Sequence, residues 1–173
     1  MGDSLSCQAC ESWSHGVTLT ALAPLTSLVR FGYRAAYWAA RAWWFIRRPH
    51  TSGAVVALWN DGRILLVQAS YRRCYALPGG FMKPGETARE AASRELAEEL
   101  RLFIPPATLR LGWCGSRRFE SRQDTVTIWE VLLDAAPVIR VDGRELIWAG
   151  WKTPVEARSM RLLPHLREYL ANR

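Results

Sequence analysis

Apolar and polar residues recur with two different periods along the chain, and these periods predict its elements. Two apolar, β-branched runs, residues 53–59 and 63–68, flank Asn60-Asp61-Gly62, which is a typical β-hairpin turn. Thr87-Ala-Arg-Glu90 has the spacing of a capping box, so it predicts a helix over residues 88–100. The remaining pattern predicts strands at residues 108–114, 125–133 and 146–151 and a closing helix over residues 154–170.

The order of these elements limits the fold class. Strands and helices are mixed without a regular βαβ alternation, which is typical of an α+β fold or a mixed α/β sandwich. A chain of 173 residues is long enough for one ordinary domain with an appendage. We therefore expect an N-terminal helical extension over residues 1–50 and one main domain over residues 51–173.

A different period precedes the first predicted strand. Residues 25–48 are rich in Arg, Ala and Leu and end before Pro49, so they predict a helix. At 100° per residue its arginines form one stripe about 40° wide. This stripe comprises Arg30, Arg34, Arg41 and Arg48, with Tyr37, Trp38, Trp44 and Phe45 beside it and Leu28, Ala35, Ala39, Ala42 and Ile46 opposite.

Two interpretations of this basic amphipathic helix remain open. It either lies peripherally in a membrane interface, or packs on its own domain or on a second subunit in a homodimer. It is a poor transmembrane span, because the uncharged run over residues 16–29 is too short. A mitochondrial transit peptide and N-terminal lipidation at Gly2 with Cys7 and Cys10 are weaker alternatives, and Asp3 and Glu11 oppose the first of them.

Charge and cysteine content exclude several classes of protein. The net charge is +7, yet both signs are mixed throughout the main domain, so we expect no specific nucleic-acid binding. Cys7-x-x-Cys10 has no second such pair, which fits neither a zinc ribbon nor a disulfide-rich secreted scaffold. Reduced thiols indicate a cytoplasmic location, peripheral to the membrane if the N-terminal helix binds it.

Three carboxylates on the predicted 88–100 helix are the first sign of chemistry. Glu95, Glu98 and Glu99 share one helical face, and we expect no cation three or four residues away to compensate them. A hard divalent ion such as Mg²⁺ would turn that repulsion into binding. The alternative is an ordinary solvated acidic face. The preceding turn at Gly79-Gly80 favours the ion site, because its backbone groups are free to approach a ligand.

These residues match a known motif. Gly80-x5-Glu86-x7-Arg94-Glu95-Leu96-x-Glu98-Glu99-x-Arg101-Leu102 resembles the Nudix box. One fixed position differs, since the family has glycine where this chain has Arg101. A glycine there would form the left-handed cap that ends the helix, and another residue costs about 1 kcal/mol in that conformation. The resemblance extends over residues 53–170.

The resemblance implies a fold, a reaction and residue roles. The fold is a mixed sheet sandwiched between helices, and the reaction is hydrolysis of a phosphoanhydride bond in a nucleoside diphosphate derivative or a nucleoside triphosphate. Arg94 and Glu86 would pair to brace the loop against the helix. The Mg²⁺ or Mn²⁺ ligands would be Glu95, Glu98 and Glu99, with the carbonyl of Gly79 as a further ligand.

Other roles stay open in the sequence. The general base is either a box residue, Glu98 or Glu99, or an external one, Glu120 or Glu145. Loss of catalysis in a nucleotide-binding or regulatory module of the same fold is the competing hypothesis. Arg117, Arg118 and Arg122 are predicted to bind substrate phosphates, and Tyr71 and Trp113 are candidates for stacking on a base.

Overall fold

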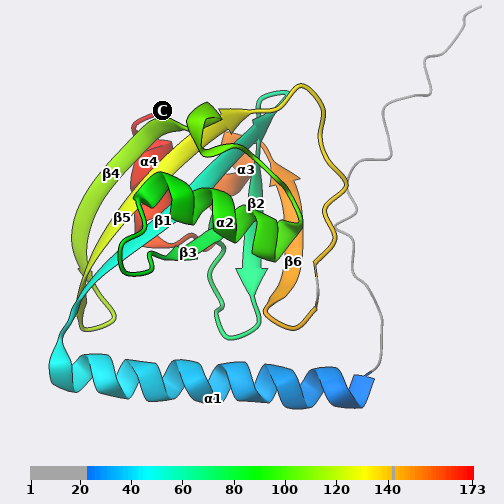
Figure 1. Ribbon diagram of the computed structural model, residues 1–173. Helices are drawn as coiled ribbons and strands as arrows, with labels where there is room; N and C mark the ends of the chain where they lie inside the picture. Colours follow the sequence, from blue (N-terminus) through cyan, green and yellow to red (C-terminus); the bar gives the residue numbers. More distant parts are fainter. Residues whose placement is uncertain (1–22, 142) are drawn as a thin grey trace, which may run out of the picture.

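The computed structural model describes residues 23–141 and 143–173 (Figure 1). Cys7, Cys10 and the N-terminal lipidation pattern lie outside the described residues. In chain order the elements are α1 (Ala23–Arg47), β1 (His50–Asn60), β2 (Arg63–Ala69), β3 (Gly79–Phe81), α2 (Ala88–Leu100), the 3-10 turn η1 (Pro106–Thr108), β4 (Arg110–Phe119), β5 (Arg122–Leu132), β6 (Leu146–Lys152), α3 (Pro154–Ser159) and α4 (Pro164–Ala171).

The strands form one mixed sheet in the order β4-β5-β1-β2-β6, and the short β3 also pairs with β1. The predicted hairpin is present, because Trp59 pairs with Ile64 across the turn between β1 and β2. Strand β1 runs parallel to β5, and the other pairs are antiparallel. A parallel pair needs a long crossover connection, and here the chain from β1 to β5 supplies it.

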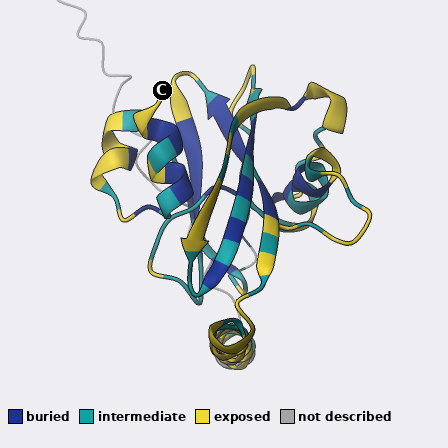
Figure 2. Cartoon of the chain, turned by 90° about the vertical axis from the view of Figure 1, so that its left-hand side faces the viewer, coloured by how far each residue is buried: buried dark blue, intermediate teal, exposed yellow. Residues whose placement is uncertain are grey.

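Helices cover both faces of the sheet, which confirms the expected sandwich (Figure 2). Strand β1 contributes to both cores, as expected of a strand buried on two faces. Ala54, Val56 and Leu58 belong to the core under α2, while Ala57 and Trp59 belong to the core under α3 and α4.

The closing segment differs from its prediction. It forms two helices, α3 and α4, instead of one over residues 154–170. Pro164 explains the break, since proline cannot donate an intrahelical hydrogen bond and is favoured in the first turn of a helix. The residues just before Pro164 are not helical, and the Leu163 N–H donates to the Tyr75 carbonyl at 3.0 Å.

Helix α1 runs along one end of the sandwich, below the β2–β3 loop and the loop before β6 (Figure 1). It ends one residue earlier than predicted, because Arg48 takes a left-handed φ of 44° before Pro49. In the described part of the chain, no helix is both long and apolar enough to cross a membrane.

Candidate active site

Helix α2 places the box carboxylates. The Thr87 hydroxyl accepts from the Glu90 N–H and the Glu90 carboxylate accepts from the Thr87 N–H, so the predicted capping box is formed. The apolar side of α2, with Leu96 and Leu100, is buried against the sheet. The helix lies so close to β3 that a Cβ added at Gly80 would be 2.7 Å from Glu95 Oε1.

Arg94 organises the outer part of the cluster. Its Nε and Nη2 donate to the two oxygens of Glu86 at 2.7 and 3.0 Å, so the expected ion pair is present. The hydrogen bonds from Arg94 lower the pKa of Glu86 to about 2. Arg94 Nη1 also donates to Glu95 Oε1 at 2.7 Å and to Glu98 Oε2 at 3.2 Å. The expectation that no nearby cation compensates these glutamates was wrong, because Arg94 lies four residues before Glu98.

Glu99 is the inner member of the cluster. Its Oε2 accepts a hydrogen bond from the Gly79 N–H at 2.9 Å. Burial raises the pKa of Glu99, the Gly79 hydrogen bond lowers it, and the negative charges of Glu95, Glu145 and Glu98 raise it, which together bring it to about 8. Gly79 has a φ of 134°, and a Cβ there would lie 2.4 Å from the Ala54 carbonyl oxygen, so only glycine fits.

The carboxylates line a cavity of about 340 Å³. Glu145, which precedes β6, joins the box residues there, and Tyr71 Oη donates to Glu145 Oε1 at 3.3 Å. The cavity therefore combines four carboxylates with only two guanidinium groups. Its lining residues are Glu95, Glu98, Glu99, Arg101, Arg140, Val141, Glu145 and Leu146.

The donor set suits a hard divalent ion. Carboxylate oxygens are the ligands that Mg²⁺ and Mn²⁺ prefer, and the mutual repulsion that burdens Glu99 would be relieved by a cation. As the side chains stand, no three potential ligands among residues 23–141 and 143–173 already surround one point. Arg94 holds Glu95 and Glu98 instead, so an ion would have to compete with it.

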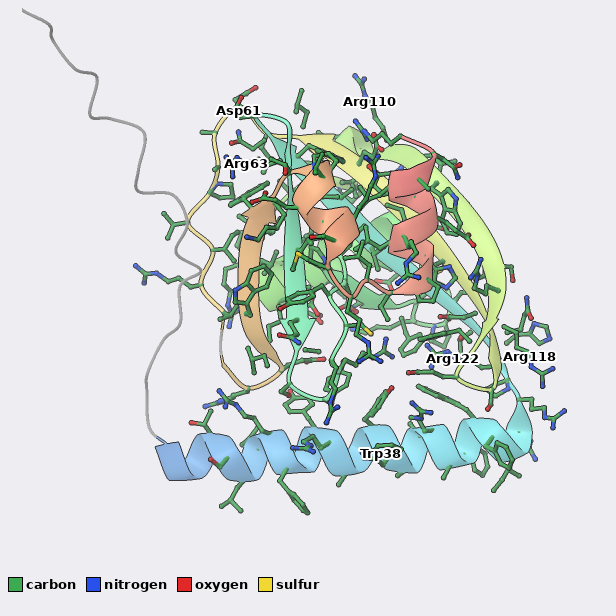
Figure 3. All side chains as sticks on the ribbon, turned by 180° about the vertical axis from the view of Figure 1, so that it is seen from behind. Trp38, Asp61, Arg63, Arg110, Arg118 and Arg122 are labelled. Atoms are coloured by element: carbon green, nitrogen blue, oxygen red, sulfur yellow. The ribbon has the colours of Figure 1, made fainter. Side chains whose placement is uncertain are left out.

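The arginines predicted to bind substrate lie elsewhere. Arg122 is 3% exposed, contacts Asp124 at 3.2 Å and stacks on Trp44, so the structure does not bring this predicted substrate residue to the cavity. Arg117 is paired with Glu168 of α4. Figure 3 shows Arg118 at the edge of the molecule, and none of the three arginines lines the cavity.

The structure also separates the two external base candidates. Glu145 lines the cavity, whereas Glu120 follows β4 and binds Tyr37 of α1, Arg72 and Arg122. The side chain of Glu120 is 9% exposed, and it does not line the cavity. The structure therefore does not bring this base candidate to the cavity.

The aromatic candidates pack within the protein. Tyr71 lies against Tyr33 and Tyr37 of α1, and Trp113 lies against His165. These contacts give both rings a packing role.

Sequence reasoning missed both cavity arginines. Arg140 lies in an irregular segment between β5 and β6, where no periodic pattern marks it. Arg101 could have been found, because it directly follows the carboxylate helix. It caps α2 with φ 58° and ψ 29°, the left-handed conformation that the glycine of the family would adopt.

Known proteins with similar sequences match only part of this chain. Over 76 residues it is 39% identical to the ADP-ribose pyrophosphatase of Methanocaldococcus jannaschii. This aligned segment covers 42% of this chain and 44% of that protein. Over 57 residues it is 44% identical to 8-oxo-dGDP phosphatase NUDT18 of Homo sapiens, covering 31% of this chain and 18% of that protein. The matches thus span less than half the length of these curated relatives.

Solved structures share the fold over a longer range. The MutT protein from Methanosarcina mazei Go1 superposes with a TM-score of 0.63 at 18% identity, covering 73% of this chain and 94% of that chain. The MutT NUDIX hydrolase from Burkholderia pseudomallei gives 0.61 at 23% identity, covering 70% and 96%. The family model of the NUDIX domain matches residues 49–172, and this chain therefore belongs to the Nudix hydrolase family.

Proposed function

We propose that this protein hydrolyses the phosphoanhydride bond of a nucleoside diphosphate derivative or a nucleoside triphosphate, with Mg²⁺ or Mn²⁺ bound by Glu95, Glu98 and Glu99. One observation carries the proposal. Three carboxylates of α2 and a fourth from the loop before β6 line one cavity together with Arg101 and Arg140. Carboxylates would hold the cation and guanidinium groups would hold the phosphates, which are the two needs of diphosphate chemistry.

The metal would supply most of the electrostatic catalysis. Bound divalent ions neutralise a diphosphate, lower the pKa of a bound water and stabilise the leaving phosphate. We assign the ion to the three box carboxylates, with the carbonyl of Gly79 as a further ligand. The Gly79 N–H would help to hold this arrangement, because it donates a hydrogen bond to Glu99 Oε2 at 2.9 Å.

The residues of the chain would orient substrate and move the proton. Arg101 and Arg140 face the cavity from two different segments, so they would grip the diphosphate from two sides. Glu145 is our choice for the general base, with Glu98 as the alternative within the box. The Tyr71 hydroxyl at 3.3 Å holds the Glu145 carboxylate in the cavity. Arg94 would act as a positioning residue through Glu86, Glu95 and Glu98.

A substrate screen tests the proposal. ADP-ribose, 8-oxo-dGDP and the common nucleoside triphosphates would be incubated with Mg²⁺ or Mn²⁺, because relatives are named for the first two. Glu98→Gln and Glu99→Gln should each reduce kcat/KM by about a hundredfold or more. Glu90→Gln is the matched control, since it changes a carboxylate of the same helix outside the cavity and glutamine also serves in a capping box.

The screen also decides against the competing function. A nucleotide-binding or regulatory module of this fold would bind a nucleotide without turnover. Undiminished turnover in both cavity variants, or nucleotide binding with no turnover by the unaltered chain, would contradict the proposed hydrolysis. The acid limb of the pH–kcat profile assigns the base, because it should disappear in Glu145→Gln and persist in Glu90→Gln.

A further inference from the structure

Helix α1 is held to the domain along one face. Near its start, Arg30 Nε donates to the carbonyl of Gly143 at 2.7 Å. In its middle, Tyr37 donates to Glu120 and its ring lies 5.2 Å from that of Tyr71. Near its end, Trp44 packs against Phe81 and against the guanidinium of Arg122, whose carbon lies 4.0 Å from the Trp44 ring centroid. These contacts fix which side of α1 turns outward.

The outward side of α1 is apolar. Phe31, Trp38 and Phe45 recur every seven residues, so they share one side of the helix, opposite Tyr33 and Trp44. The large apolar side chains of this side are 58–73% exposed, and Figure 2 shows the side of α1 away from the domain as exposed. They are Leu28, Phe31, Trp38, Trp43, Phe45 and Ile46, which we call the outer face. Large contiguous apolar patches on soluble domains mark interaction sites.

Charges around the outer face indicate what covers it. Arg34, Arg47 and Arg48 are exposed, and no carboxylate of the described chain lies within ion-pair distance of them. The chain has no Asp or Glu between Ser12 and Asn60. An apolar strip bordered by uncompensated arginines complements a lipid interface with anionic headgroups, where apolar side chains enter the acyl boundary and guanidinium groups meet phosphates.

The tryptophans add to this complementarity. The Arg41 guanidinium lies 5.2 Å from the Trp38 ring, and that of Arg47 lies 5.4 Å from the Trp43 ring. Indole rings prefer the depth at which lipid tails meet headgroups, and the guanidinium groups would extend from there to the phosphates.

A second copy of the chain fits the outer face less well. In a symmetric antiparallel pair of α1 helices, each flank of one helix meets the same flank of its copy. The arginine stripe would then face another arginine stripe, and no acidic residue of α1 could compensate it. An anionic lipid surface removes that repulsion.

We propose that the outer face of α1 docks in the plane of a membrane that contains anionic lipids. The domain then sits on the membrane with its cavity near the lipid surface. Gly143, which accepts the hydrogen bond from Arg30, lies two residues from Glu145 of the cavity. The rim of the cavity would therefore lie about one helix diameter, roughly 10 Å, above the lipid.

Vesicle flotation tests the docking. The full chain should float with phosphatidylcholine vesicles that contain phosphatidylglycerol, and less with phosphatidylcholine alone or at high salt. The triple variant Phe31→Ser/Trp38→Ser/Phe45→Ser should lose at least about tenfold in partition coefficient, because it removes apolar area from the interface. The triple variant Phe103→Ser/Leu132→Ser/Val155→Ser is the matched control, since it removes equally exposed apolar side chains elsewhere and should float like the unaltered chain.

Two further measurements complete the test. Arg34→Gln/Arg47→Gln should weaken flotation on the anionic vesicles only, and thermal melting followed by circular dichroism should show that all variants fold. Sedimentation velocity without vesicles should give a monomer. Failure of the full chain to float, equal flotation of the outer-face triple, or a dimer that this triple dissociates would overturn the proposal. None of these readouts uses hydrolysis, so they stand apart from the proposed reaction.

Discussion

Two acidic clusters of this protein differ in how their charge is balanced. At the cavity, Glu95, Glu98, Glu99 and Glu145 converge, and the cations paired with them, Arg94 and Lys83, contact only Glu95 and Glu98. At the junction of β4, β5 and α1, Glu120 contacts Arg41 and Arg122 at 3.5 Å and Arg72 at 3.4 Å. The first cluster retains negative charge that faces an opening, whereas arginines enclose the second.

The pKa values of the two clusters move in opposite directions. Burial and the repulsion from three neighbouring carboxylates together raise the pKa of Glu99 to about 8. Burial also tends to raise the pKa of Asp124, but the neighbouring His165 ring at 3.6 Å and hydrogen bonds from Thr51 and Arg122 outweigh it and hold that pKa at about 2. A closed, neutralised cluster stabilises the fold, while an open, negative one is suited to take up a cation.

Breaking the closed cluster should have the largest effect on stability. Glu120→Gln would remove the carboxylate that Arg72 and Arg122 share and leave only Asp124 beside Arg122, so it should lower the free energy of unfolding by about 3 kcal/mol. Urea denaturation followed by fluorescence would measure it. At pH 7 Glu99→Gln is the contrasting variant and should raise the free energy of unfolding instead, because the Glu99 carboxyl keeps its proton in the folded protein but loses it on unfolding, whereas glutamine is neutral in both states. Equal losses in both variants would remove the distinction between the clusters.

The arginines of the cavity should affect substrate binding more than those predicted from the sequence. Arg140→Gln should raise KM for the substrate found in the screen by about tenfold, since a charged hydrogen bond to phosphate contributes roughly 1.5 kcal/mol. Arg118→Gln is the matched control, because Arg118 lies outside the cavity. If steady-state kinetics showed the larger effect in Arg118→Gln, substrate would bind along β4 instead.

The opposite pKa shifts predict opposite responses to pH in the metal-free protein. The folded pKa of Glu99 lies above its ordinary 4.5, so its contribution to stability is complete below pH 4.5 and disappears as the pH rises through 8. The folded pKa of Asp124 lies below its ordinary 3.8, so its contribution is complete above pH 3.8 and disappears as the pH falls through 2. Neither slope exceeds about 1.4 kcal/mol per pH unit.

Chemical denaturation across this pH range, with EDTA present, would separate the two contributions. Glu99→Gln should flatten the alkaline decline, and Asp124→Asn should flatten the acid decline. If the stability of Glu99→Gln still declined unchanged as the pH rises, ionisation of Glu99 would not be the cause of the decline.

The smallest expected effect concerns the end of α2. Arg101→Gly would remove the strain of a side chain at φ 58°, so it should raise the free energy of unfolding by about 0.5 to 1 kcal/mol. Because Arg101 also lines the cavity, the same variant should weaken substrate binding. Arg101→Lys is the control for charge, since it keeps both the cation and the strain. A loss of stability in Arg101→Gly would contradict the assigned strain.

Local signals explain what the sequence predicted well. The Asn60-Asp61-Gly62 turn, the capping box at Thr87 and the proline after α1 act within a few residues, so hairpin, α2 and α1 were all predicted. The three box glutamates belong to one helix, α2, so it was also predictable that they would line the same cavity. Glu145 was identified only through its resemblance to a segment of the family.

Contacts between distant segments explain what the sequence did not predict. Glu120 and Arg122 were candidate site residues because they are charged, but the packing of α1 against β5 encloses both side chains. The three residues of β3 are too few to show a period, and they form a strand because β1 offers an open edge. The outer face of α1 could be drawn on a helical wheel, yet only the contacts of Tyr37 and Trp44 determine which face turns inward.

Anomalous diffraction from crystals soaked in Mn²⁺ would show whether the cavity binds a cation. We expect a manganese peak within the cavity, bounded by the carboxylates of Glu95, Glu98 and Glu99, with Arg94 released from at least one of them. The same soak of Glu99→Gln crystals should give a weaker peak or none. A cavity without a peak, in which Arg94 still binds Glu95 and Glu98, would contradict the claim that the open cluster exists to hold a cation.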